Sequence, residues 1–169
     1  MEFIKTDFED LYLIDFFEMK DNRGKFIKPW YFEDNNNLSE IYCTTSKKGT
    51  IRGLHYQESD SAQKKQVTCL SGIIEDISLD MRKNSPTYGK IFRYILNSSN
   101  NTSILIPHGF AHAIYAHEDS IVMTCCDKAF NPTSEKGINW MSLDDLSDLN
   151  VLEISEKDRA LPSWDLLNE

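Results

Sequence analysis

The sequence has little of several features that would mark particular classes of protein. Its 169 residues contain four cysteines, five prolines and seven glycines. The longest apolar runs, such as Ser103–Pro107 and Ile121–Met123, are far too short to span a bilayer. The first ten residues, MEFIKTDFED, are acidic and lack the apolar region of a secretory signal. We therefore expect a cytoplasmic protein that makes no use of a membrane.

Cations are also in the minority. Lys and Arg number 18 against 27 Asp and Glu, which gives a net charge of −9. Because affinity for nucleic acid arises mainly from cations that meet phosphates, we expect no DNA or RNA partner. Hydrophobic residues make up 40% of the chain and charged residues 27%, so a folded core is expected. The length fits a single domain over residues 1–169, in which residues 142–169 form a C-terminal segment packed on the rest.

The few cysteines and histidines argue against a disulfide framework and against a metal centre. Even cysteine counts indicate disulfides mainly in small secreted chains, so we expect reduced structural thiols. Small β-barrel enzymes often hold iron or zinc through a His-x-His pair. Here Gln57 stands two residues after His55, and no His-x-His occurs anywhere in the chain. The sequence therefore predicts no metal.

What the sequence does have is an alternation of period two. Ile77, Leu79 and Met81 are apolar while the residues between them are polar, as in a strand with two unlike faces. Similar runs predict strands at 11–17, 26–32, 40–45, 51–57, 66–70, 91–96, 103–106 and 120–126. About nine or ten strands separated by turn signals indicate a β-sandwich or barrel. Helical turns are expected only at Ser142–Leu149 and Ser163–Leu167.

Polar side chains that point inward from such strands are candidate site residues. In the strand expected at 51–57, period two places Gly53, His55 and Gln57 on one face and the residues between them on the other. Taken singly, each ionisable candidate also fits an ordinary structural or surface role. The sequence pattern alone therefore assigns no function to His55, Lys65, His112 or Asp158.

Several blocks taken together, and in order, resemble one known family. They are DNRGKF at 21–26, RGLHYQ at 52–57, Lys65, LDMRKNSPTYG at 79–89, IPHGFAH at 106–112, and shorter matches within 131–140 and 155–162. These are similar to the nucleotide-sugar 3,5-epimerases typified by dTDP-4-dehydrorhamnose 3,5-epimerase. The resemblance implies an all-β fold, a cupin-type jelly-roll barrel with short helical turns in the C-terminal segment. It also implies a homodimer that uses no cofactor.

The same resemblance implies roles for individual residues. His55 is the expected base, Asp158 the carboxylate that orients it, and Lys65 the cation at the sugar keto oxygen. The expected ligand is a nucleoside diphosphate 4-keto-6-deoxy sugar, with dTDP as the nucleotide, in deoxysugar and surface-polysaccharide biosynthesis. The residues expected to bind it are Arg23, Phe26, Arg52, Gln57, His112, Phe130 and Glu135.

Several positions depart from the family pattern, among them Lys28, where the family often has Glu, and Phe130, where it has tyrosine. Thr124 stands where the family has its general-acid tyrosine, and Glu40 and Tyr42 stand where it has Gln and Asn. One hypothesis is an epimerase that inverts C3, with or without C5, and takes its proton from Tyr42 or from a water. A second is a related ketosugar isomerase, and a third is a non-catalytic nucleotide-sugar-binding protein. Convergence of His55, Asp158 and Lys65 on one cavity favours the enzymes, whereas a cleft blocked by Glu40 favours the binding protein.

Overall fold

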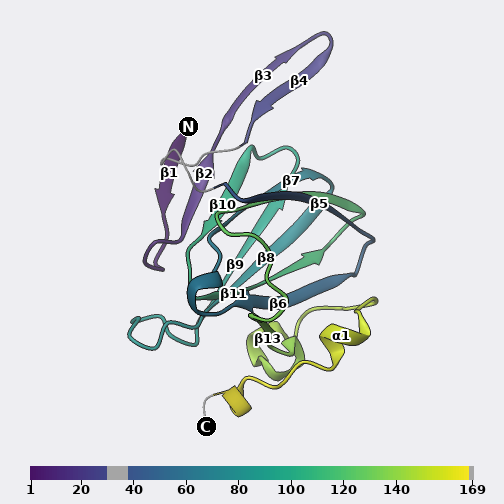
Figure 1. Ribbon diagram of the computed structural model, residues 1–169. Coiled ribbons are helices and arrows are strands. Elements are labelled where there is room, and N and C mark those ends of the chain that lie inside the picture. Colours follow the sequence, from purple (N-terminus) through teal and green to yellow (C-terminus); the bar gives the residue numbers. More distant parts are fainter. Residues whose placement is uncertain (30–37, 168–169) are drawn as a thin grey trace.

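The computed structural model describes residues 1–29 and 38–167, and within them nearly all regular structure is β-strand (Figure 1). Two antiparallel sheets face each other. The first has the strand order β1-β2-β10-β7-β12-β5, with bounds Glu2–Lys5, Tyr12–Asp15, Thr102–Ile106, Lys65–Ser71, Ser120–Cys126 and Glu40–Ser46. The second has the order β13-β6-β11-β8-β9, with bounds Glu135–Gly137, Ile51–Gln57, Phe110–Ala116, Ile73–Asp80 and Ile91–Asn97. The all-β prediction is confirmed.

One hydrophobic cluster fills part of the space between the two sheets. Val67, Ile104 and Val122 come from the first sheet, and Ile74 and Phe110 come from the second. All five are at most 5% exposed. Burial of one such side chain contributes roughly 1.5–3 kcal/mol, so this cluster holds the sheets together. The remaining space between the sheets is the cavity described below.

A second cluster lies on the outer face of the second sheet, under the C-terminal segment. Ile77 and Leu79 of β8 pack there with Leu143, Leu146 and Leu149. The alternation read from the sequence therefore has its apolar face under this segment. Short helices lie at the start of this segment and within it, namely η2 (Trp140–Ser142), η3 (Asp144–Leu146), α1 (Glu156–Arg159) and η4 (Asp165–Leu167). A further one, η1 (Ser59–Ser61), lies earlier in the chain. Within the described ranges, no helix has the length and apolarity needed to cross a membrane.

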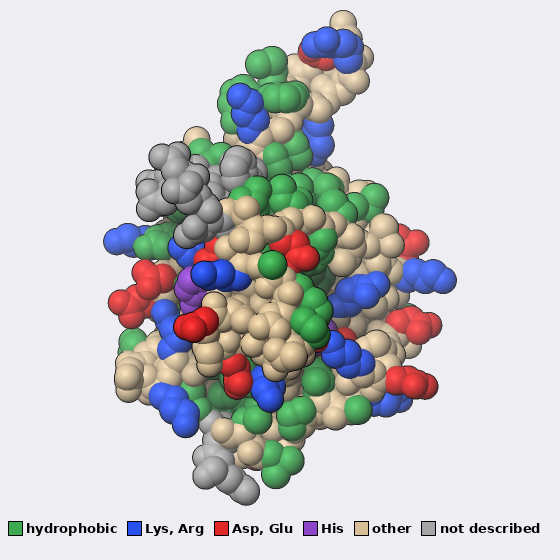
Figure 2. Space-filling model, viewed as in Figure 1, with side chains coloured by type: hydrophobic (Ala, Val, Ile, Leu, Met, Phe, Trp, Pro, Cys, Tyr) green, Lys and Arg blue, Asp and Glu red, His purple; other side chains and the backbone are tan. Residues whose placement is uncertain are grey.

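A two-stranded hairpin projects away from the sheets (Figure 1). It consists of β3 (Phe17–Asp21) and β4 (Gly24–Lys28), which pair with each other. Three large apolar side chains on it, Phe17, Met19 and Phe26, are 47%, 56% and 53% exposed. Figure 2 shows hydrophobic side chains gathered on this projection. The hairpin thus offers an apolar surface that the rest of its own chain leaves open.

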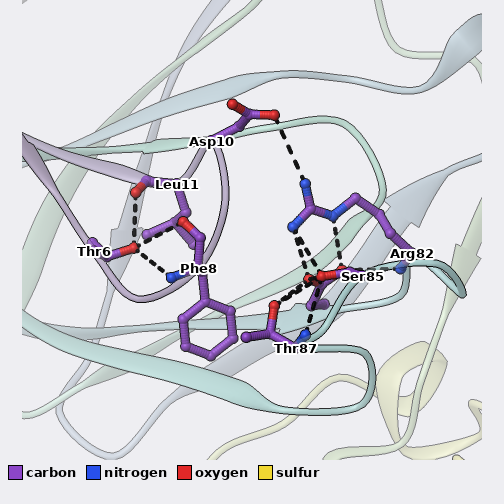
Figure 3. A network of polar contacts seen from close by, with 8 residues as sticks. Thr6, Phe8, Asp10, Leu11, Arg82, Ser85 and Thr87 are labelled. Carbon is purple, nitrogen blue, oxygen red and sulfur yellow. Dashed lines mark hydrogen bonds and ion pairs between the residues drawn. The ribbon is translucent and has the colours of Figure 1, made fainter.

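A polar network ties the end of β8 to the loop that follows it (Figure 3). Asp80 is fully buried, and its carboxylate accepts hydrogen bonds from Arg82 Nε at 2.9 Å, Ser85 Oγ at 2.7 Å and Thr87 Oγ1 at 2.7 Å. The Arg82 guanidinium also reaches to 4.0 Å from Asp10, in the loop before β2. These contacts fix the loop because a buried carboxylate is stable only when its oxygens are satisfied.

The structure differs from the sequence prediction in several elements. Strand β11 was not predicted, because all seven of its residues are buried and it shows no polar face. The run at 11–17 divides into β2 and β3, and β1, β13 and α1 were also missed. The run at 26–32 appears as the end of β4, and its part beyond Pro29 lies outside the described residues.

Candidate active site

A cavity of about 1080 Å³ lies between the two sheets. One wall comes from β5, β7 and β12 and the other from β6 and β11, while residues 153–158 close one side. His55, Lys65 and Asp158 all line this cavity, together with Tyr42 and Thr124. Its volume is that of a cleft which takes a small organic ligand. His55, Asp158 and Lys65 therefore converge on one cavity, which is the arrangement that favours an enzyme.

The centre of the site is a histidine–carboxylate pair. His55 Nε2 lies 2.7 Å from Asp158 Oδ1, and Gly53 N donates to Asp158 Oδ2 at 3.1 Å. Asp158 is 4% exposed and sits in the first turn of α1, whose N-cap residue Ser155 accepts a hydrogen bond from Asp158 N at 3.0 Å. Burial opposes ionisation of this carboxyl, but hydrogen bonds from His55, Gly53 and Ser155 outweigh it and lower its pKa.

The state of Asp158 decides the state of His55. An ionised carboxylate only accepts hydrogen bonds, so His55 Nε2 must carry the proton that it shares with Asp158. In the neutral ring the other nitrogen, Nδ1, then has a free lone pair. With 28% of its side chain exposed, His55 can bring this nitrogen to a ligand in the cavity. The arrangement is that of a general base held in one tautomer.

Strand β6 does not follow the simple alternation expected of it. His112 of β11 pairs with His55, but Ile114 pairs with Arg52, so the register shifts between them. As a result Arg52 and His55 both line the cavity, although period two places them on opposite faces. The shift lies at Gly53, where the backbone has φ +120° and an added Cβ would stand 2.4 Å from His112 O. Glycine is required here by both conformation and space.

Lys65 supplies a cation to the opposite wall. It is the first residue of β7, is half-buried, and lines the cavity. Within the described part of the chain its ammonium makes no hydrogen bond or ion pair. Burial lowers its pKa, and four negative or ionisable neighbours partly offset this, namely Cys126, Glu135, Asp76 and Glu40. A cation of this kind is available to a developing negative charge on a ligand.

A second histidine–carboxylate pair lies deeper in the same cavity. His112 is 8% exposed, and its Nε2 lies 2.7 Å from Asp76 Oδ2. Asp76 also accepts a hydrogen bond from Ser78 Oγ at 3.1 Å, and Asp76 and Ser78 are fully buried. Sequence reasoning did not single out Asp76. The sequence signal that could have found Asp76 is its place on the polar face of β8, two residues before Ser78.

A smaller cavity of about 320 Å³ shares Tyr42, His55 and Lys65 with the first. Its remaining lining includes the predicted residues Gln57, Phe130 and Glu135, and also Glu40. The Gln57 amide is fully engaged, because it accepts from Asn131 N at 2.6 Å and donates to Ser61 O at 2.7 Å. Gln57 thus fixes the loop that carries Phe130.

The two carboxylates of the smaller cavity are also held in place. Glu40 Oε2 accepts a hydrogen bond from Phe130 N at 3.2 Å, so its carboxylate is tied to the rim of the cavity. Glu135 forms an ion pair with Lys157.

In the larger cavity, Arg52 donates to Ser46 Oγ and to Thr45 O, both at 2.9 Å. Among the residues that the structure describes, no group of three or more His, Cys, Asp or Glu is placed to hold a metal ion.

Two predicted binding residues lie elsewhere. Arg23 and Phe26 are on the projecting hairpin, and neither lines a cavity described here. The Arg23 side chain is 89% exposed and pairs with Asp21 at 2.6 Å. Arg23 and Phe26 therefore do not reach the cavity that contains His55 of the same chain.

Comparison with known proteins places the chain among enzymes of one kind. The family model for dTDP-4-dehydrorhamnose 3,5-epimerase matches residues 5–165. The enzyme of that name from Methanothermobacter thermautotrophicus is 33% identical over 179 aligned positions, which cover 99% of this chain and 95% of the relative. The crystal structure of the Elizabethkingia anophelis enzyme superposes with a TM-score of 0.88 at 31% identity, covering 100% of this chain and 99% of that one.

A further solved structure contains a ligand. It is the Legionella pneumophila dTDP-6-deoxy-D-glucose-3,5-epimerase in complex with dTDP-4-keto-L-rhamnose, with a TM-score of 0.90 and 29% identity over 98% of this chain and 94% of that one. The likeness extends over both facing sheets and the C-terminal segment, and it confirms the cupin-type jelly roll expected from the sequence. The chain belongs to the dTDP-4-dehydrorhamnose 3,5-epimerase family.

Proposed function

We propose that this protein epimerises a dTDP-linked 4-keto-6-deoxy sugar, inverting C3, by proton abstraction at the carbon beside the ketone. The single observation that carries the proposal is the convergence of the His55–Asp158 pair and the Lys65 ammonium on one cavity. Membership of the family supplies the reaction class and deoxysugar biosynthesis as its setting. Whether C5 is inverted as well is decided by the experiment below.

Each of the three residues has a defined task. His55 Nδ1 takes the proton from C3, and the electron pair of the broken C–H bond moves toward the keto oxygen. Asp158 stabilises the imidazolium that forms, because its carboxylate shares the proton on Nε2. Lys65 faces the enolate oxygen, where loss of such a group typically costs roughly 3–4 kcal/mol of transition-state stabilisation.

The nucleotide part has its own candidate contacts. Arg52 presents a guanidinium at the cavity wall, and such a planar group suits the oxygens of a pyrophosphate. Phe130 is 52% exposed beside the smaller cavity, where an aromatic ring can stack on a nucleobase. His112 and Glu135 are proposed to hydrogen-bond the sugar or its diphosphate. The dTDP-sugar bound to the Legionella relative supports the choice of nucleotide.

We also propose that the usual proton donor is altered. Thr124 is 2% exposed and lines the cavity at the position that the family pattern gives to an acidic tyrosine. An aliphatic hydroxyl is too weak an acid to replace a phenol directly. The proton for the second half of the reaction must then come from another group.

A homodimer accounts for Arg23 and Phe26. If these residues bind substrate, they must reach the cavity of a second copy, because the hairpin carries them away from their own. The exposed apolar side chains of the hairpin support such an interface. Mixing Arg23→Ala protein with His55→Asn protein, followed by subunit exchange, is then expected to restore activity that neither has alone. A mass near 20 kDa by light scattering, with no restoration, would count against the dimer.

The reaction itself is tested in D₂O. Incubation with dTDP-4-keto-6-deoxyglucose is expected to place deuterium at C3, seen by NMR, and His55→Asn is expected to abolish it. His117→Asn is a matched control, because His117 pairs with Glu75 and does not line the cavity. Deuterium at both C3 and C5 would extend the proposal, while uptake at neither carbon would favour a protein that only binds the sugar nucleotide.

A further inference from the structure

An epimerisation that inverts a carbon needs a proton donor on the face opposite the base, and this requirement rests on the function proposed above. His55 belongs to β6, in the second sheet. The donor must therefore come from the wall formed by the first sheet. The described hydroxyl groups that line the larger cavity from the strands of that sheet belong to Tyr42, Thr44, Thr45, Ser46, Ser71, Ser120 and Thr124.

Chemistry separates these hydroxyls. A phenol ionises near pH 10, whereas the alcohols of Ser and Thr do not ionise in the range where proteins work. A general acid must release its proton as the new C–H bond forms, so a phenol suits the task far better than an alcohol. Tyr42 is the one phenol among the described residues of this cavity wall.

The position of Tyr42 fits the task as well. It lies on β5, directly paired with Thr124 of β12. It lines both cavities and shares both with His55 and Lys65, so it stands where the two spaces meet. The residue is 39% exposed, so it lies at the open side of the cavity wall rather than in the core.

The surroundings keep the phenol protonated. Burial raises the pKa of Tyr42, and the neighbouring Cys126 and Glu40 raise it further, while an interaction with the Thr124 hydroxyl lowers it by less. Tyr42 therefore carries its proton at neutral pH. Thr124 contacts the phenol from the paired strand and is placed to orient it.

We propose that Tyr42 is the catalytic acid of this site and delivers its Oη proton to C3 on the face opposite His55. In the first half, the C3–H bond breaks, the proton goes to His55 Nδ1 and the enolate forms beside Lys65. In the second half, the Tyr42 O–H bond breaks, a new C3–H bond forms and the carbonyl is restored. The phenolate then takes a proton from water and the imidazolium gives one up, so no electrons are gained or lost.

The test separates abstraction from inversion. Tyr42→Phe keeps the ring and removes only the hydroxyl. We expect the formation of inverted sugar to fall by about 10²–10⁴-fold, the usual worth of general acid catalysis. We expect deuterium exchange at C3 with retained configuration to fall by less than tenfold, because His55 still removes the proton and can return it. Tyr94→Phe is the matched control, since Tyr94 of β9 lines neither cavity.

Each outcome has one meaning. A selective loss of inversion supports Tyr42 as the acid. Equal losses of exchange and inversion, or no loss of either, overturn it, and thermal unfolding of the variant shows whether the fold has changed. If wild-type protein neither exchanges nor inverts the substrate, then the proposed function fails, which is distinguishable from failure of the Tyr42 assignment alone.

Discussion

The Asp158 carboxylate lies 2.7 Å from His55 Nε2, although the two residues are 103 positions apart in the chain. They come from unlike elements, a strand of the second sheet and a four-residue helix in the C-terminal segment. Packing of that segment on the outer face of the sheet brings the helix to the cavity mouth. The proposed base and the carboxylate proposed to orient it therefore depend on the same packing.

This dependence predicts the effect of Asp158→Asn. The amide can accept from His55 Nε2 but cannot stabilise an imidazolium, so we expect kcat to fall by roughly 10²–10⁴-fold. Deuterium uptake at C3 should fall with it, because abstraction itself is impaired. Glu156→Gln, on the same helix and exposed, is the control and should leave the rate within about twofold. An Asp158→Asn protein with a normal rate of uptake would contradict the role given to this carboxylate.

Lys65 predicts a pH dependence. In the proposed mechanism the ammonium of Lys65 is the active form, and burial lowers its pKa below the ordinary value of 10.5. As pH rises through that lowered pKa, the ammonium is lost, so kcat should fall on the alkaline side. Lys65→Met removes the charge at similar length and is expected to reduce kcat by roughly 10²–10³-fold.

The dependence of kcat on pH in the variant provides the check. In Lys65→Met the alkaline fall should disappear from what activity is left, while KM for the sugar nucleotide changes little. Lys90→Met, remote from both cavities, is the control. An alkaline fall at the same pH in Lys65→Met would assign that fall to another group.

Asp80 predicts a loss of stability rather than of activity. Its pKa is lowered to about 2, because bonds from Arg82, Ser85 and Thr87 outweigh the burial that opposes ionisation. A folded pKa below the unfolded value of 3.8 stabilises the protein above pH 4 by about 2 kcal/mol, and this is lost as pH falls toward 2.

Urea unfolding measures this contribution. Asp80→Asn should reduce the free energy of unfolding at pH 7 by roughly 3 kcal/mol, because it also leaves buried donors poorly paired. The difference in free energy of unfolding between Asp80→Asn and the wild type should become smaller at pH 3. Asp144→Asn, an exposed carboxylate in η3, should change stability by less than about 0.5 kcal/mol. A gap that stays constant from pH 7 to pH 3 would show that ionisation of Asp80 is not its source.

Sequence reasoning predicted some parts of this molecule well because they have a local signal. Strand β6 runs over Ile51–Gln57, as predicted, since turn residues precede it in the sequence. Strand β11 had no such signal, because it is buried on both faces. The shared orientation of Arg52 and His55 was also hidden, as it arises from a register shift against β11.

The candidate site was predictable only in part for a related reason. No local pattern links Asp158 to His55, so the pairing came from the resemblance to a family and from nothing in the spacing of the residues. The packing of Gln57 against the loop at Asn131 likewise depends on tertiary contacts. The placement of Arg23 on a projecting hairpin was not visible either, because strand patterns do not say where a hairpin points.

Gly53 provides the last prediction, because it joins the fold to the site. An added Cβ would lie 2.4 Å from His112 O and 2.8 Å from Ala113 Cα, at a backbone φ of +120°. Crowding and strain together should reduce the free energy of unfolding in Gly53→Ala by roughly 2–5 kcal/mol. Gly24→Ala is a matched control, since Gly24 has φ +127° but no atom within 4 Å of the added Cβ. Its smaller loss measures the conformational strain alone. If both variants lose the same stability, then close packing of β6 against β11 is not what requires glycine beside His55.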